Sequence, residues 1–301
     1  MGMNEKEMLK EGLKKRTAEV EAVVEAFLPE ETGHQKTIFE AMNYSVRAGG
    51  KRLRPMLMEE TYRLFGGDGE EIQPFMAAIE MIHTSSLIHD DLPCMDNDTL
   101  RRGLPTTWVK FGYDMAVLAG DALLIYAVET AAKAFEKTKR PDLVGRAIGI
   151  LAQKTGIYGM IGGQVVDVEL TGKPIPQDKL DFIYRLKTGA LLEASMMIGA
   201  VLAGASEEEI AVTEQIASAV GLAFQIQDDI LDVTSTPEQL GKPVLSDEKN
   251  NKTTYVTLVG IDQAHKDVQE ISERAVQLLE KLPGENPFLA GLIRMLVTRD
   301  K

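Results

Sequence analysis

Apolar residues recur along this chain with a helical period, and the most informative of the predicted helices also carries a polar stripe. Gln225, Asp228, Asp229 and Asp232 fall at i, i+3, i+4 and i+7, which places them on one face. Much of the remaining surface is apolar, with Ile216, Val220, Phe224, Ile226, Ile230 and Leu231. A helix with this pattern belongs in the middle of a bundle, with its acidic stripe facing a cavity.

A second segment, residues 74–91, has the same design, because His83, Ser86 and Asp90 share one face of an otherwise apolar predicted helix. The chain shows no convincing strand-type alternation. Breakers rich in Gly and Pro separate segments of roughly 15–30 residues or longer, which predicts long helices and short loops. We expect one all-α domain over residues 1–301.

Composition is that of an ordinary soluble protein, with 44% hydrophobic residues and a mean hydropathy of −0.10. No run of about 18 apolar residues is evident, so no membrane span is expected. The N-terminal residues 1–15 lack the apolar core of a signal peptide. The single cysteine, Cys94, suits a reducing compartment, and we expect a cytoplasmic location. The net charge of −13 argues against nucleic acid as a partner.

Two aspartate clusters lie 138 residues apart (228 − 90) in apolar surroundings. Their members are Asp90, Asp91 and Asp96 in the first, and Asp228, Asp229 and Asp232 in the second. Buried carboxylates are costly unless something offsets their desolvation. Mg²⁺ is usually bound by one or two carboxylates, with water and phosphate completing its shell. The clusters therefore predict metal-assisted diphosphate chemistry.

One alternative for a single cluster is a solvated acidic helix end, which two matched clusters make less favourable. An EF-hand is excluded, because the sixth and twelfth positions counted from Asp96 are Arg101 and Thr107 instead of Gly and Glu.

The two clusters differ in geometry. Asp228 and Asp232 are four residues apart, about 40° around a helix, and can bind metal together without distortion. Asp90 and Asp96 are six residues apart, so a regular helix would separate them. Pro93 disrupts a helix, and a two-residue bulge there would restore an effective i, i+4 pair. A straight helix through Asp96 would contradict this hypothesis.

Basic residues supply the countercharge that an anionic substrate needs in an acidic protein. Lys51, Arg52 and Arg54 follow a glycine pair at a predicted helix start, and arginine suits forked phosphate contacts. Other candidates are Arg101, Arg102, Lys187, Lys242 and Lys252. A surface basic patch is the alternative for the first group. The glycines at 159, 162 and 163 are expected to permit close helix packing, with a supporting role for Gln164.

Several motifs occur in a fixed order: Gly49-Gly50-Lys51, Ile88-His89-Asp90-Asp91-Leu92-Pro93, Leu100-Arg101-Arg102-Gly103, Ala119-Gly120-Asp121, Gly162-Gly163-Gln164, Lys187-Thr188 and Phe224-Gln225-Ile226-Gln227-Asp228-Asp229. Together they resemble those of the trans-isoprenyl diphosphate synthases, in the bacterial short-chain branch of farnesyl and geranylgeranyl diphosphate synthases. The resemblance implies a polyprenyl synthase bundle of about ten or more helices around a deep central cleft. It also implies a homodimer and the condensation of isopentenyl diphosphate with an allylic diphosphate, dimethylallyl or geranyl.

The resemblance further implies residue roles. About three Mg²⁺ ions per active site would be held by Asp90, Asp96 and Asp228, with Asp91 and Asp232 near them. Catalytic residues and allylic diphosphate ligands would be Arg101, Lys187, Thr188, Gln225 and Lys242, with Lys252 as a further ligand. Isopentenyl diphosphate would be bound by Lys51, Arg54, His83 and Arg102.

Product length is the main departure from the farnesyl pattern. Farnesyl synthases of this branch usually carry an aromatic residue five positions before the first aspartate, where this chain has Ser85. Ser85 and Ser86 would leave space for a longer product. General similarity favours farnesyl diphosphate, which is the expected product, and geranylgeranyl diphosphate is the alternative that Ser85 favours.

Two remoter alternatives are a terpene cyclase and a non-catalytic subunit of a heteromeric prenyl synthase. A cyclase needs no isopentenyl site, so Lys51, Arg54 and His83 argue against it. A non-catalytic subunit tends to lose one acidic cluster, and both are intact here.

Overall fold

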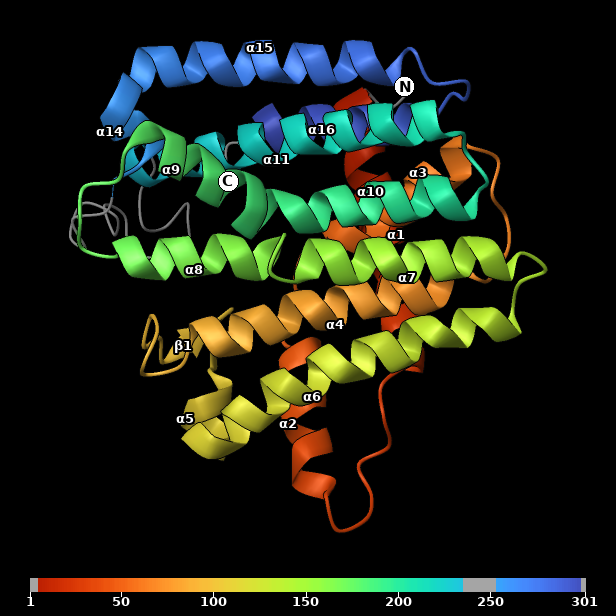
Figure 1. Cartoon of the computed structure of the whole chain (residues 1–301), viewed down its shortest axis with the longest axis vertical. Coiled ribbons are helices and arrows are strands. Elements are labelled where there is room, and N and C mark those ends of the chain that lie inside the picture. The colour runs from red at the N-terminus through yellow and green to blue at the C-terminus, as the bar shows by residue number, and fades with distance from the viewer. Residues whose placement is uncertain (1–4, 235–252, 299–301) are drawn as a thin grey trace.

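The computed structural model describes residues 5–234 and 253–298 and confirms the all-α prediction (Figure 1). The α-helices are α1 (Glu5–Ala26), α2 (Lys36–Arg47), α3 (Leu53–Leu64), α4 (Ile72–Asp90), α5 (Thr107–Phe111), α6 (Tyr113–Ala132), α7 (Pro141–Thr155), α8 (Met160–Leu170), α9 (Gln177–Ile183), α10 (Ala190–Leu202), α11 (Glu207–Thr234), α14 (Tyr255–Val259), α15 (Ile261–Leu279) and α16 (Pro287–Thr298). A 3₁₀-helix, η1 (Lys133–Glu136), follows α6, and a π-helix, η2 (Tyr184–Gly189), joins α9 to α10.

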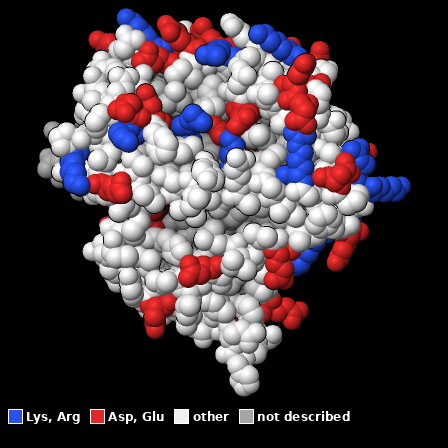
Figure 2. Space-filling view, viewed as in Figure 1, with Lys and Arg blue, Asp and Glu red and all other residues white. Residues whose placement is uncertain are grey.

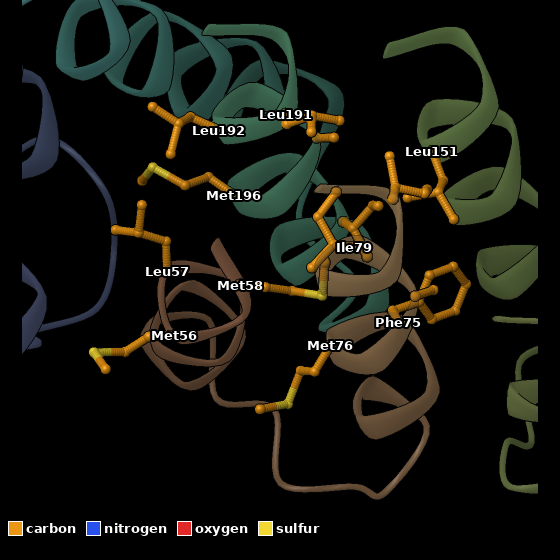
Figure 3. Close-up of a cluster of buried hydrophobic side chains, with 14 of the residues drawn as sticks. Met56, Leu57, Met58, Phe75, Met76, Ile79, Leu151, Leu191, Leu192 and Met196 are labelled. Carbon is orange, nitrogen blue, oxygen red and sulfur yellow. The ribbon is translucent and has the colours of Figure 1, made fainter. Parts of the chain in front are cut away.

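The hydrophobic core joins α3, α4, α7 and α10, whose apolar side chains meet between the helices (Figure 3). Met58, Phe75 and Leu191 are almost fully buried there. Gly199 of α10 allows a close approach to α3, because a Cβ at this position would lie 2.3 Å from the carbonyl oxygen of Met58. Such contact fixes the spacing of α10 and α3 and leaves little freedom to the helices that frame the site.

The first acidic cluster lies where α4 ends. The helix stops at Asp90, and the backbone N–H of Asp96 then donates to the carbonyl oxygen of Asp90 at 2.9 Å. No straight helix runs through Asp96, so the hypothesis of a disruption at Pro93 stands. The disruption differs from the expected bulge, since the helix ends and the chain turns back on itself.

A hairpin too short to be anticipated follows this turn. Strands β1 (Leu100–Arg101) and β2 (Leu104–Pro105) pair antiparallel. The two residues between them, Arg102 and Gly103, both have positive φ angles, of 54° and 78°. A two-residue turn with two positive φ angles matches the twist of a hairpin. The hairpin thereby holds Arg101 and Arg102 next to the first acidic cluster.

Helix α6 modifies the expectation about membranes. Together with η1 it spans Tyr113–Glu136, which is long and apolar enough to cross a bilayer by length and composition. Of its most apolar window, 39% is buried inside the molecule. Core helices of soluble proteins pass the same test, so this helix by itself indicates neither environment.

Candidate active site

A cavity of about 830 Å³ lies among α4, α6, α8, η2 and α10. Its lining includes the predicted site residues Arg54, His83, Ser85, Ser86, Asp90, Lys187 and Thr188. Most of its wall is apolar, with Val117, Leu124, Ile161 and Val165 among the lining residues. Figure 2 shows the face on which α4, α6 and α8 lie: its middle is mostly uncharged, and charged side chains gather toward its upper part. The cavity thus combines a mostly apolar lining with charged side chains, among them Arg54, Asp90 and Lys187.

The carboxylate of Asp90 is held between two helices. Its Oδ1 accepts a hydrogen bond of 2.7 Å from Nε2 of Gln164 on α8. Burial raises the pKa of Asp90, the ammonium of Lys187 opposes this rise, and Asp96 reinforces it. The last effect means that the two carboxylates repel each other and would gain from a shared cation.

Asp91 is buried and engages Arg101. The Nε atom of Arg101 donates to both carboxylate oxygens of Asp91, at 2.8 and 2.9 Å, and its Nη2 lies 2.6 Å from Oδ1. Burial raises the pKa of Asp91, and this forked contact lowers it. Asp91 therefore orients Arg101.

The π-helix η2 carries Lys187 and Thr188. π-Turns are rare and often occur at functional sites. Lys187 Nζ donates to Asp167 Oδ2 at 2.6 Å, and the Thr188 hydroxyl donates to Gln225 Oε1 at 3.0 Å. Burial alone would lower the pKa of Lys187, but Asp167 and Asp90 raise it, so the ammonium stays charged. The expected close helix packing is confirmed for Gly163, where a Cβ would lie 2.3 Å from the Lys187 amide nitrogen, whereas Gly159 and Gly162 approach the backbone just before them, at Lys154 and Ile157.

The second acidic cluster is arranged differently from the prediction. Asp229 is buried, and its Oδ2 accepts from the Tyr184 hydroxyl at 2.5 Å and from the Tyr255 amide at 2.8 Å. Asp232 is also buried, and neither they nor Asp228 line the cavity. The expected cavity-facing stripe is therefore wrong for this cavity, which none of its four residues lines, and Asp229 instead ties α11 to η2 and to the start of α14.

The predicted isopentenyl site forms in part around His83, about two turns before Asp90 on α4. Arg54 and His83 line the cavity together. Arg102 donates to the carbonyl oxygen of Gly49, beside Lys51. Burial, with Arg54 and Arg102 nearby, lowers the pKa of His83 well below its usual value, so the imidazole is neutral at pH 7. Lys51 is exposed and does not line the cavity; Lys242 and Lys252 lie outside the described residues.

A family model described as Polyprenyl synthetase matches residues 35–283 of the chain. The chain belongs to this family. It is 46% identical to a chloroplastic geranylgeranyl pyrophosphate synthase of Catharanthus roseus, over 87% of this chain and 74% of the relative. It is 43% identical to a farnesyl diphosphate synthase of Geobacillus stearothermophilus, over 87% and 88%. A crystal structure of an FPP/GFPP synthase from Zymomonas mobilis superposes with a TM-score of 0.85 at 33% identity, covering 96% and 98%.

These similarities identify this polyprenyl synthetase as a short-chain prenyltransferase of the group that contains the FPP and GGPP synthases. The group's substrates are isopentenyl and allylic diphosphates. The resemblance inferred from the motifs is thereby confirmed. The relatives divide between farnesyl and geranylgeranyl synthases, so they leave the product open.

Two residues of α8 have larger roles in the site than their sequence pattern indicated. Gln164 and Asp167 hold Asp90 and Lys187, respectively. Their spacing of three residues on one helix face was the available signal. Their partners could not be read from the chain, because the contacts span 74 and 20 residues.

The donors of this polyprenyl synthetase fit a hard cation. In the described parts of the chain, no group of three or more His, Cys, Asp and Glu side chains is arranged to hold a metal by itself. Mg²⁺ does not need such a cage, because it usually binds one or two carboxylates and keeps water and substrate phosphate as its other ligands. Asp90 and Asp96, brought together by the turn after α4, suit that style of binding.

Proposed function

We propose that this polyprenyl synthetase condenses isopentenyl diphosphate with allylic diphosphates and extends them through farnesyl to geranylgeranyl diphosphate. One observation carries the proposal: a single apolar cavity has Asp90 and Lys187 in its lining and also Ser85, where an aromatic residue would shorten it. The charged side chains in the lining suit a diphosphate, and the apolar wall suits a prenyl tail.

The proposed first step is ionisation of the allylic C–O bond, in which the diphosphate leaves with the bonding pair. Bound at Asp90, Asp96 and Asp228, Mg²⁺ would supply Lewis-acid stabilisation of that leaving group. Lys187 and Arg101 would add fixed positive charge, and their carboxylate partners, Asp167 and Asp91, preorganise them. Asp232 would act near the metals, and Lys242 and Lys252 would complete the allylic site.

The proposed second step joins the allylic cation to the double bond of isopentenyl diphosphate. The hydroxyl of Thr188 and the amide of Gln225, already hydrogen-bonded to each other, would stabilise the cation by their dipoles without capturing it. Lys51, Arg54, His83 and Arg102 would hold the isopentenyl diphosphate group. Loss of a proton, with the released diphosphate as base, completes the product, and the apolar wall excludes water that would quench the cation.

Product length follows from the cavity wall in this proposal. Ser85 is almost completely buried, and its hydroxyl donates to the Ile82 carbonyl at 2.7 Å, so the side chain occupies little of the cavity. Ser86 likewise donates to the His83 carbonyl at 2.8 Å. Farnesyl diphosphate is the second candidate product, supported by the similarity to a farnesyl diphosphate synthase.

Sizing of the products tests the proposal. Purified protein is incubated with labelled isopentenyl diphosphate, geranyl or farnesyl diphosphate and Mg²⁺, and the dephosphorylated products are separated by chain length. We expect twenty-carbon products, which EDTA abolishes and added Mg²⁺ restores. Arrest at fifteen carbons would favour the second candidate, a cyclic hydrocarbon would favour a cyclase, and no elongation would refute the synthase proposal.

We also propose that the protein is a cytoplasmic homodimer. Helix α6 supports the dimer, because it exposes three large apolar side chains to solvent: Leu118, Ile125 and Val128. Ile125 is 72% exposed. Apolar side chains grouped on one helix are typical of interfaces between copies.

A further inference from the structure

Arg52 lies inside the predicted phosphate-binding motif but turns away from the cavity. Arg52 is 5% exposed and lines a separate hollow with Glu21 and Val46. Arg54, two residues later, lines the substrate cavity. Arg52 is therefore placed to act on the motif's geometry and not on substrate.

The side chain of Arg52 joins three helices. Its Nη1 donates to Oε1 of Glu80 on α4 at 2.7 Å, and both side chains are nearly fully buried. Its Nη2 donates to the carbonyl oxygen of Val46, in the last turn of α2, at 2.6 Å. Its backbone is the N-cap of α3. One residue thus fixes where α2 ends and α3 begins, relative to α4.

The backbone of Arg52 is held in a conformation that non-glycine residues seldom adopt, with φ 50° and ψ 34°. Arg102, on the hairpin, also has a positive φ, and its guanidinium packs so closely on Gly50 that a Cβ there would lie 2.8 Å from Nη2. Such conformations persist where surrounding structure enforces them, and they occur often at functional sites. The buried ion pair of Arg52 with Glu80 is suited to hold the Arg52 backbone in this conformation.

Glu80 also acts on the charges around it. It lies three residues before His83, on α4, and does not line the cavity. Burial lowers the pKa of both Arg54 and Arg102, and the negative charge of Glu80 opposes this shift in each. Glu80 therefore provides a buried countercharge beneath a group of cations.

We infer that Arg52 and Glu80 are a pair of positioning residues for isopentenyl diphosphate. The pair holds the 49–54 turn in its left-handed form, so that Lys51 and Arg54 extend toward the same diphosphate as His83 and Arg102. Neither member touches substrate. The inference rests on the proposed isopentenyl site and extends it to two residues behind that site.

The sign of the affinity change distinguishes positioning from simple electrostatics. If Glu80 acted only as a negative charge near an anion site, Glu80→Gln would strengthen isopentenyl diphosphate binding. If it positions the turn, the same change weakens binding, because Arg52 loses its buried charged partner and keeps only Glu21, 3.7 Å from its Nε. The double variant Arg52→Met/Glu80→Leu replaces the pair with apolar side chains of similar size, so that neither member of the pair is left as a buried charge without the other.

The test measures KM for isopentenyl diphosphate, KM for geranyl diphosphate, kcat and thermal unfolding in these variants. Calorimetric titration with isopentenyl diphosphate gives the affinity directly. We expect KM and Kd for isopentenyl diphosphate to rise at least about tenfold in Glu80→Gln and in the double variant, while KM for geranyl diphosphate stays within about twofold. The matched control is Glu60→Gln, which breaks another buried ion pair, with Arg16 at 2.8 Å, away from the cavity; it should leave both KM values unchanged.

An unchanged or lower KM for isopentenyl diphosphate in the folded double variant overturns the positioning role, as does an equal rise in both KM values. In either case, elongation by the unmodified enzyme leaves the proposed function standing. Failure of the unmodified enzyme to elongate any allylic diphosphate overturns both proposals.

Discussion

Single residues of this site are governed by neighbours that lie far away in sequence. Asp90 is held by Gln164, and Asp91 by Arg101. The sequence was sufficient to select Asp90 and Arg101, because burying a charged group is costly unless it is paired or binds a ligand. It could not show that Asp229 anchors Tyr184 and Tyr255, since that depends on how three segments meet.

Asp90→Asn is expected to reduce turnover without reducing stability. Burial raises the pKa of Asp90, so the folded state binds the proton more tightly than the unfolded chain does, and ionisation opposes folding as pH rises through that pKa. Removing the charge therefore costs no stability at pH 7. Turnover should fall at least about a hundredfold, because a proposed metal ligand is lost. Steady-state kinetics and urea unfolding check this. Asp68→Asn, on an exposed loop, is the control, and full turnover in Asp90→Asn would contradict the assignment.

Ser85→Phe is expected to shorten the product from twenty carbons to fifteen. The ring would occupy part of the cavity that Ser85 lines, and overpacking would lower the stability by about 1–3 kcal/mol. Ser85→Ala adds no volume and should leave chain length unchanged. Chromatography of the dephosphorylated products compares the two variants. If the phenylalanine variant still makes the unmodified enzyme's product, another residue closes the cavity.

At the scale of the elements, the helical period was sufficient to predict the polar stripes of α4 and α11. The residues of each stripe could be assigned because positions i, i+3 and i+7 share a face whatever surrounds the helix. The π-turn of η2 and the end of α4 at Asp90 were less accessible. Both depend on packing, because Gly163 admits the η2 backbone and the chain after Asp90 must turn to meet the hairpin.

Gly199→Ala is expected to destabilise the fold by about 1–3 kcal/mol, because the added Cβ would press on the α3 backbone at the Met58 carbonyl. Gly149→Ala on α7 is the matched control. A Cβ there meets nothing within 4 Å, so this variant should be stabilised by about 0.5–1 kcal/mol through helix propensity. Denaturant unfolding measures both changes. Equal effects of the two substitutions would contradict the close approach of α10 to α3.

For the whole molecule, the net charge says less about function than the positions that the fold gives to charged and apolar side chains. The net charge of −13 gives no hint of an anion site, because the fold gathers Arg54, Arg101 and Lys187 from three separate segments of the described chain. The exposed apolar residues of α6 likewise follow from which faces the other helices leave uncovered.

Replacing both Leu118 and Ile125 with lysine is expected to convert a dimer into a monomer. Each charge would be buried without a partner at the proposed interface, which is strongly unfavourable. Light scattering after size-exclusion chromatography should give twice the chain mass of 33.1 kDa for the unmodified protein and a single mass for the variant. Met8→Lys, another exposed apolar position, should remain dimeric. A monomeric unmodified protein would refute the dimer proposal.

The sequence by itself determined the all-α class, the two aspartate clusters, the basic motifs and the resemblance to prenyl synthases, because helical period and residue chemistry are local properties. Only the tertiary structure decided which of those residues share a cavity. It brought Ser85, Asp90 and Lys187 together and turned Asp229 and Arg52 into the protein interior. The reason is physical: burial and pairing arise from contacts between distant segments, which no local pattern specifies.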